Sequence, residues 1–338
     1  MKLNLLLSSV FIFTLFTLIS CKKNNNEKPV KSHDIYIAGD VNGQPVYWKN
    51  GIETSLPPYS SNGTMGGQAT GIAFSGDDMY VCGMSSALFG GSKAIYWKNG
   101  ILDTLSHIQG HPTDAVAITS IGGDVYIGGG YNGYGTGQGY KGATLWKNEI
   151  PTEFGNSQTR INSLFATDRD LYSAGPDGDG IGNTYATYYK NGTVVKLSDQ
   201  SGLTSSGIFV SGSDVYVCGY SNGYEPQAVY WKNSIETLLS SQPASAYAIY
   251  VSGNDVYVAG WELFNDKTVA TIWKNGIATH LSSSESYCND IAVLDNDVYA
   301  VGEMATPDHI YGTSVLWKNN TATVLATTES NALKLYVK

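Results

Sequence analysis

An aspartate and a lysine recur once in each of a series of similar segments along the chain. The aspartates open the motif Asp-apolar-Tyr-x-x-Gly, and the lysines stand in aromatic-Lys-Asn. Carboxylates and amines can exchange protons with a substrate when they converge on one site. A group that is repeated by symmetry, once per segment and beside a turn, better fits a structural role. We therefore expect the aspartates to cap turns and the lysines to lie on the same rim.

One acidic loop could hold a metal ion. Asp177, Asp179 and Asn183 place oxygen ligands in a glycine-rich turn, which a hard cation such as Ca²⁺ would accept. The loop lacks a third inner aspartate and a closing bidentate glutamate, and Asp-Gly sequences are also ordinary turn chemistry. We predict no cofactor and no metal, and keep Ca²⁺ at these three residues as the alternative.

The other reactive side chains form no catalytic pattern, so the sequence assigns no catalytic residue. Cys82 and Cys218 occupy a slot that holds alanine in other segments, which indicates small buried residues, and Cys288 has no evident partner. His107 and His111 are the only histidines with close spacing. No phosphate loop or His-Glu-x-x-His occurs. A sialidase-like site would need an arginine cluster, and the chain has only Arg160 and Arg169.

The repeats themselves indicate the architecture. The motif begins at Asp34, Asp78, Asp124, Asp170, Asp214, Asp255 and Asp297, so successive copies lie 44, 46, 46, 44, 41 and 42 residues apart. Each copy is followed by its aromatic, at Trp48, Trp97, Trp146, Tyr189, Trp231, Trp273 and Trp317. A period in the low forties fits four short strands, the size of one propeller blade. The sequence therefore predicts an all-β, seven-bladed propeller with four antiparallel strands per blade.

The sixth copy shows how a blade divides into strands. Ala246–Ser252 forms strand a, Gly253 and Asn254 turn the chain, and Asp255–Gly260 forms strand b. A variable loop leads to strand c around Trp273, Asn275 and Gly276 make a type I′ turn, and Ile277–Leu281 forms strand d. The first copy begins with strand b, whereas the chain ends just after a strand-a segment, 331–337. We expect that C-terminal strand to complete the first blade and close the ring.

The repeats also resemble known families. Asp214–Gly219 followed by Tyr230–Asn233 is similar to a divergent kelch-type blade, although the kelch Gly-Gly doublet occurs only at Gly128 and Gly129. Ala228–Ser234 with Ser245–Ile249 resembles the HAF-type repeats of bacterial extracellular proteins. Both resemblances cover nearly all of 34–338 and imply a propeller in a secreted setting, without implying one activity.

Differences between copies point to a binding face. The b-to-c loops vary in length, and they share one face of the ring with the d-to-a crossovers, which we call the variable face; the a-to-b and c-to-d turns lie on the other, tight-turn face. Variable loops on a rigid scaffold commonly carry binding sites. We predict ligand contacts from the aromatic residues of this face, namely Trp261, Tyr131, Tyr134, Tyr220, Tyr224 and Tyr311. The alternative is that these aromatics pin the loops to the blades.

The N-terminus has the features of an export signal. Met1 and Lys2 precede an apolar run, Leu5–Ile19, which is short for a membrane span and ends at Ser20 and Cys21. The pattern resembles the bacterial lipoprotein signal, which implies that Cys21 is acylated and becomes the mature N-terminus. An uncleaved membrane anchor is the alternative. We predict a signal over 1–20, a flexible tether over 21–32 and the propeller over 33–338, in an outer-membrane lipoprotein facing either the periplasm or the exterior.

The function predicted from these features is binding of a glycan or a partner envelope protein by the variable face. The alternatives are a polysaccharide hydrolase or lyase with its site at the channel mouth, and a structural subunit of an envelope complex. The formal net charge of −9 argues against nucleic acid and anionic lipid as partners, so the membrane is contacted through the lipid anchor alone. We expect a monomer.

Overall fold

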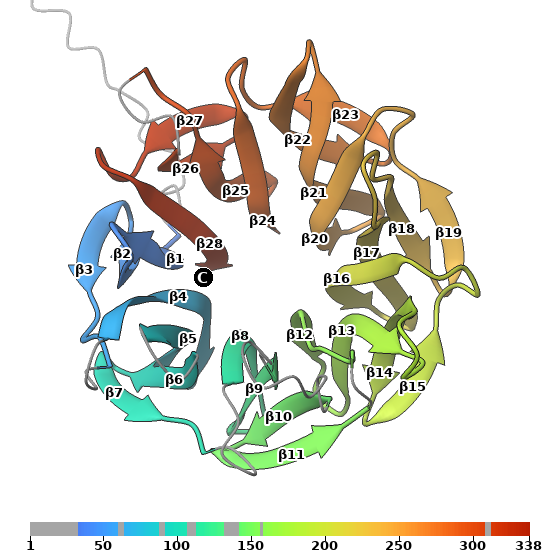
Figure 1. Cartoon of the computed structure of the whole chain (residues 1–338). Helices are drawn as coiled ribbons and strands as arrows, with labels where there is room; N and C mark the ends of the chain where they lie inside the picture. The colour runs from blue at the N-terminus through green and yellow to red at the C-terminus, as the bar shows by residue number, and fades with distance from the viewer. Residues whose placement is uncertain are drawn as a thin grey trace, which may run out of the picture. The chain divides into compact units, whose positions relative to one another are not determined.

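The computed structural model describes residues 33–59, 64–87, 92–106, 113–131, 142–155, 158–307 and 312–338. Asp34–Lys338 forms one compact unit. Its strands make seven four-stranded antiparallel sheets that follow one another in a ring (Figure 1). The inner strands of all seven sheets line a central channel. The predicted fold class is thus confirmed. In the described part of the chain, no helix is long and apolar enough to span a bilayer.

Each blade is a meander whose first strand lines the channel and whose last strand lies outermost (Figure 1). Blade 1 contains β28 (Ser330–Val337), β1 (Ile35–Val41), β2 (Gln44–Lys49) and β3 (Ile52–Ser55). Blade 2 contains β4 (Thr64–Ser75), β5 (Asp78–Ala87), β6 (Lys93–Lys98) and β7 (Ile101–Thr104). Blade 3 contains β8 (Thr113–Ile121), β9 (Asp124–Tyr131), β10 (Ala143–Lys147) and β11 (Ile150–Phe154).

The other four blades repeat this order. Blade 4 contains β12 (Ser163–Ala166), β13 (Leu171–Gly178), β14 (Thr184–Lys190) and β15 (Thr193–Lys196). Blade 5 contains β16 (Leu203–Ser211), β17 (Asp214–Ser221), β18 (Ala228–Lys232) and β19 (Ile235–Leu238). Blade 6 contains β20 (Ala244–Ser252), β21 (Asp255–Phe264), β22 (Lys267–Lys274) and β23 (Ile277–His280). Blade 7 contains β24 (Ser286–Leu294), β25 (Asp297–Met304), β26 (Thr313–Lys318) and β27 (Thr321–Val324).

The C-terminal strand closes the ring, as the sequence predicts. β28 pairs antiparallel with β1, with Tyr336 opposite Tyr36. Two backbone hydrogen bonds fasten the ends of the pair: the amide of Asp34 donates to the carbonyl of Lys338 at 2.8 Å, and the amide of Lys338 donates to the carbonyl of Asp34 at 3.0 Å. The free edge that β1 would otherwise expose is thereby covered.

The recurrent aspartates and lysines pair with each other on the tight-turn face, which confirms a structural role. In every blade the lysine ammonium lies 2.7–2.9 Å from the aspartate carboxylate and 5.1–5.6 Å from the centre of the strand-b tyrosine ring. An asparagine at positive φ begins each c-to-d turn, for example Asn275 at φ 52°. Its side chain donates to the aspartate, as Asn275 does to Asp255 at 2.8 Å. The motif thus ties two turns of each blade together.

The strand-b glycine recurs in every blade for a different physical reason. An added Cβ would overlap a backbone carbonyl oxygen of the neighbouring inner strand or, in blade 4, of Arg160 just before that strand; this holds at Gly39, Gly83, Gly129, Gly175, Gly219, Gly260 and Gly302. Beside this glycine the pairing shifts register in most blades; in blade 6 the extra residue is Tyr247, between Ala246 and Ala248. Glycine therefore permits the close approach of two backbones at a β-bulge.

The aromatic of each strand c packs between blades rather than lining a site. Trp48, Trp97, Trp146, Trp231 and Trp273 are completely buried. Cys82, Cys218 and Cys288 are likewise buried and free, as expected from the slot that the first two share with alanine. These residues form the interblade cores.

The expected loop between strands b and c is absent in blade 6. β21 continues from Gly260 to Phe264 and turns into β22 through Asn265 and Asp266, both at positive φ. Two such residues suit a type I′ hairpin turn, whose twist matches the strands beside it. Trp261 and Phe264 are therefore strand residues, and the predicted end of strand b at Gly260 is wrong by four residues. Blade 1 has the same tight connection, through Asn42 and Gly43.

Candidate functional site

Four aromatic residues from blades 5 to 7 lie together at the variable-face end of their strands. Tyr220 and Trp261 directly follow the strand-b glycines of β17 and β21. Tyr247 is the bulged residue of β20. Tyr287, on β24, lies opposite Glu303 of β25. We call this set, Tyr220, Tyr247, Trp261 and Tyr287, the aromatic platform.

Direct contacts hold the platform in place. The indole Nε1 of Trp261 donates a hydrogen bond to the Tyr247 hydroxyl at 2.8 Å. The Trp261 and Tyr287 rings meet edge to face with centroids 6.4 Å apart, and Tyr220 and Tyr247 do the same at 6.0 Å. All four side chains are only partly buried. The rings are thus both ordered and accessible, as a recognition surface requires.

Burial raises the pKa of two of the platform phenols, Tyr247 and Tyr220. Burial raises the pKa of Tyr247 to about 12, while the hydrogen bond from Trp261 acts in the opposite direction. Burial also raises the pKa of Tyr220. A neutral phenol can both donate and accept a hydrogen bond. The platform therefore offers apolar ring surface together with uncharged hydroxyls.

Two carboxylates lie at the variable-face end of their strands, and one of them, Glu303, is opposite the platform residue Tyr287. Glu303 follows the strand-b glycine of β25, and Asp40 holds the equivalent position in β1. Burial and, secondarily, the charge of Asp40 raise the pKa of Glu303 to about 7. Asp40 accepts hydrogen bonds from Gln68 at 3.0 Å and Asn331 at 3.1 Å. Among the described residues, Glu303 has no hydrogen-bond or ion-pair partner.

Two further pairs of ionisable groups on this face are engaged with each other. Arg160 lies 2.6 Å from Asp114 in an ion pair. Glu262 accepts a hydrogen bond from Ser240 and lies 2.7 Å from the Nε2 of His280. Such paired groups shape the face and leave little charge for a ligand.

The residues predicted from the sequence to contact a ligand fall into different groups in the structure. Trp261 and Tyr220 belong to the platform, whereas Tyr224 is fully exposed at 106% and makes no ring contact among the described residues. Phe264 stacks on His280 with centroids 4.0 Å apart. Cys21, Tyr134 and Tyr311, like His107 and His111, lie outside the described residues, as does the side chain of Tyr131. Tyr247, Tyr287 and Glu303 were not predicted. The signal for Glu303 was an acidic residue beside the repeat glycine and that for Tyr247 an aromatic residue in the bulge opposite it, whereas Tyr287 has neither feature.

The acidic loop of blade 4 satisfies its own carboxylates. Asp179 accepts hydrogen bonds from the backbone amide of Ile181 at 2.9 Å and from the side chain of Asn183 at 2.6 Å. Asp177 accepts a hydrogen bond from Thr159. No cluster of three or more histidine, cysteine, aspartate or glutamate side chains suited to a metal occurs in the described segments. The loop geometry is that of an ordinary Asx turn.

No protein-family model matches the chain, and no curated protein shows significant similarity to it. The likeness to kelch and HAF repeats therefore stays a prediction.

Solved structures share the architecture at low identity. The propeller domain of the Trilobed protease from Pyrococcus furiosus matches with TM-score 0.52 and 11% identity over 88% of this chain and 93% of that one. A puromycin-hydrolysing peptidase of Mycobacterium tuberculosis matches with TM-score 0.53 and 11% identity over 86% and 51%. A sialidase of Trypanosoma rangeli matches with TM-score 0.50 and 10% identity over 83% of this chain and 58% of the sialidase.

These likenesses concern the fold alone. The Pyrococcus domain is described as an open velcro, whereas β28 closes the first blade here. The chain spans little more than half of the sialidase and of the Mycobacterium peptidase. Its two arginines lie apart, since Arg160 pairs with Asp114 while Arg169 is exposed in the a-to-b turn of blade 4. By its repeats, its strand order and these neighbours, the chain is a seven-bladed β-propeller.

Proposed function

We propose that the chain is a lipid-anchored protein of the cell envelope that binds glycans through the aromatic platform. The observation that carries the proposal is the platform itself, an ordered group of four accessible aromatic rings beside Glu303, a carboxylate with no partner among the described residues. Sugar rings have apolar C–H faces that stack on aromatic side chains and hydroxyls that bond to carboxylates and phenols.

The scaffold holds the platform rigidly, which favours ligand binding over a function that needs a conformational change. Backbone pairing around every blade and the closure by β28 hold the strand ends in a fixed arrangement. A preorganised site loses little conformational entropy when it binds its ligand. Platform residues on strands, rather than on long loops, therefore favour a recognition module.

The N-terminal sequence supports a lipid anchor. Leu18, Ile19, Ser20 and Cys21 follow a short apolar run, which is the pattern that directs acylation of the cysteine. A lipid attached there would hold the propeller at a membrane surface, and the polar stretch 22–30 would serve as tether. The acidic net charge disfavours nucleic acid as the ligand.

One observation favours a second candidate, a glycan hydrolase. Glu303 has a pKa of about 7, within the range of a general acid, and the nearby charge of Asp40 contributes to it. Two carboxylates beside a sugar-binding surface are the minimum for glycoside hydrolysis. In that case the wild type would release new reducing ends from its glycan, and Glu303→Gln would bind the glycan without cleaving it.

A glycan array tests the proposal. The wild-type chain is applied to immobilised glycans beside Trp261→Ala and Phe264→Ala. Phe264 is the matched control, because it is an aromatic of the same strand that stacks on His280 outside the platform. We expect the wild type and Phe264→Ala to bind the same glycans and Trp261→Ala to lose them. Binding of no glycan, or equal binding by all three proteins, would contradict the proposal.

A further inference from the structure

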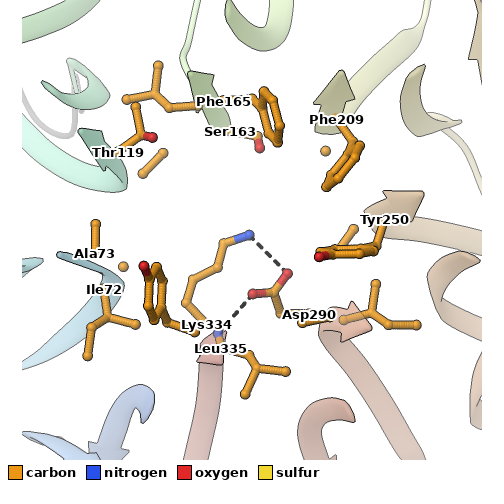
Figure 2. Close-up of a pocket in the computed structure, with 18 of the residues that line it drawn as sticks. Ile72, Ala73, Thr119, Ser163, Phe165, Phe209, Tyr250, Asp290, Lys334 and Leu335 are labelled. Carbon is orange, nitrogen blue, oxygen red and sulfur yellow. Dashed lines mark hydrogen bonds and ion pairs between the residues drawn. The ribbon is translucent and has the colours of Figure 1, made fainter. Parts of the chain in front are cut away.

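The tight-turn half of the channel contains a cavity of about 500 Å³ (Figure 2). Its lining comes from the inner strands of all seven blades, such as Gly71–Phe74 of β4 and Lys334–Val337 of β28. None of the platform residues lines it. A volume between about 300 and 1,000 Å³ is typical of small-molecule sites. The cavity is therefore large enough for a ligand and separate from the site on the variable face.

Two blades break the sevenfold pattern inside this cavity. On each inner strand, one residue stands opposite the small residue that precedes the strand-b glycine. Five blades carry a small residue there, namely Gly71, Ala117, Ser163, Gly207 and Ala248. The adjacent blades 7 and 1 instead carry Asp290 and Lys334. Small residues at this position are sufficient for the fold in five blades. The fold therefore does not explain why blades 7 and 1 carry charged side chains there.

The ion pair stands in the open part of the channel. The Lys334 ammonium lies 3.5 Å from one Asp290 oxygen, and the other oxygen accepts a hydrogen bond from the backbone amide of Leu335 at 2.8 Å. Figure 2 shows the Lys334 side chain extending into the middle of the opening, toward Asp290. An ammonium has three N–H donors. Within the described residues, this one long contact is the only polar interaction of the Lys334 ammonium.

Aromatic rings form one wall of the same cavity. Phe165, Phe209 and Tyr250 come from the successive blades 4, 5 and 6. Their ring centroids are 4.7 Å apart between Phe165 and Phe209 and 4.6 Å apart between Phe209 and Tyr250. Thr119 and Ser163 place hydroxyls on the wall across from the ion pair (Figure 2). The cavity thus combines a wall of aromatic rings with one cation, one anion and several hydroxyls.

We propose that this cavity is a second binding site, for a neutral sugar of one or two rings. The ion pair has no net charge, so an anionic or cationic ligand would meet one repulsive partner. A pair of neighbouring sugar hydroxyls can accept from Lys334 and donate to Asp290 at once, with no ligand charge to desolvate. The apolar face of the ring then lies on Phe165, Phe209 and Tyr250.

The proposal stands apart from the platform and is tested separately. Saturation-transfer NMR is recorded on the full-length chain in detergent with glucose, galactose, mannose, N-acetylglucosamine, cellobiose and chitobiose. The variants are Lys334→Met and Asp290→Asn, which keep side-chain size, and Asp290→Asn also keeps an acceptor for Leu335. Lys274→Met is the matched control, because Lys274 forms the same kind of ion pair on the rim, 2.7 Å from Asp255.

We expect at least one of these sugars to bind the wild type, Lys274→Met and Trp261→Ala alike. Lys334→Met and Asp290→Asn should bind it about tenfold more weakly or not at all, because each loses a charged hydrogen bond. Melting temperatures close to wild type would show that the variants fold. Three results would overturn the proposal: no sugar binds, both channel variants bind like the wild type, or the zwitterion phenylalanine displaces the sugars. Loss of binding in Trp261→Ala alone would assign the sugar to the platform instead.

Discussion

Replacing Gly260 by alanine should destabilise the propeller far more than the same replacement at Gly253 in the same blade. At Gly260 the new Cβ would overlap the Ser245 carbonyl oxygen and lie 2.9 Å from its carbon and 3.0 Å from the Ala246 Cα. All three neighbours are backbone atoms of β20, so no side chain can rotate away. At Gly253, φ is +60° and an added Cβ meets no atom within 4 Å.

The loss in free energy of unfolding caused by each substitution follows from this geometry. A residue with a Cβ at positive φ costs roughly 1–2 kcal/mol, and the stiffer unfolded chain returns about 0.4–1 kcal/mol of it, so Gly253→Ala should lose about 1 kcal/mol. Forcing an atom into closed backbone packing costs about 3 kcal/mol or more, because β20 and β21 must separate at the bulge. The contribution of the unfolded chain is common to both variants, so their free energies of unfolding should differ by at least about 1 kcal/mol.

Urea unfolding followed by tryptophan fluorescence measures this difference. We expect the unfolding midpoint of Gly253→Ala to lie near that of the wild type, and Gly260→Ala to unfold at much lower urea or to fail to fold. Equal midpoints for the two variants would refute the claim that the repeat glycine exists for backbone approach.

Three further predictions concern the ends of the chain and its buried carboxyl. Cys21→Ala should abolish acylation, because only the thiol can take the thioether lipid; membrane fractionation and labelling with a radioactive fatty acid measure this, and wild-type labelling would contradict the anchor. Deleting 331–338 removes most of β28 and exposes the edge of β1, so we expect aggregation or a large fall in melting temperature; a monomeric variant melting like the wild type would contradict closure. Glu303 has a folded-state pKa of about 7, above its unfolded value, so its contribution to stability is complete below about pH 4.3 and is lost as the pH rises through 7. Glu303→Gln should therefore melt near the wild type at low pH and above it at pH 8, and equal melting temperatures at pH 8 would contradict the raised pKa.

The sequence predicted the fold well because each blade repeats the same local instructions. The aspartate, the strand-b glycine and the asparagine of the c-to-d turn each have a backbone or pairing requirement that recurs in all seven blades. The closure of the ring could be predicted by counting strands at the two ends of the chain, since β28 supplies the strand a that the first copy lacks. In blade 6 the b-to-c connection is a hairpin and not the expected variable loop, because Asn265 and Asp266 both adopt positive φ and so suit a tight turn.

The candidate site was predicted only in part, because it depends on contacts between blades. Trp261 could be named from the sequence as the one tryptophan outside the repeat slot. Its partner Tyr247 could not, because its position in a bulge is set by the register of β20 against β21. Asp290 and Lys334 do leave a trace, as charged residues in a column of small ones, but that column is aligned only once the strand pairing is known.

The central claim is that the aromatic platform binds the ligand rather than merely packing the blades. The measurement that tests it most directly is glycan affinity and melting temperature on one preparation of Trp261→Ala. We predict that the affinity falls by about 2 kcal/mol or more, as for an aromatic anchor, while the melting temperature falls only slightly through loss of the hydrogen bond to Tyr247. A large fall in melting temperature with unchanged affinity per folded molecule would contradict the account.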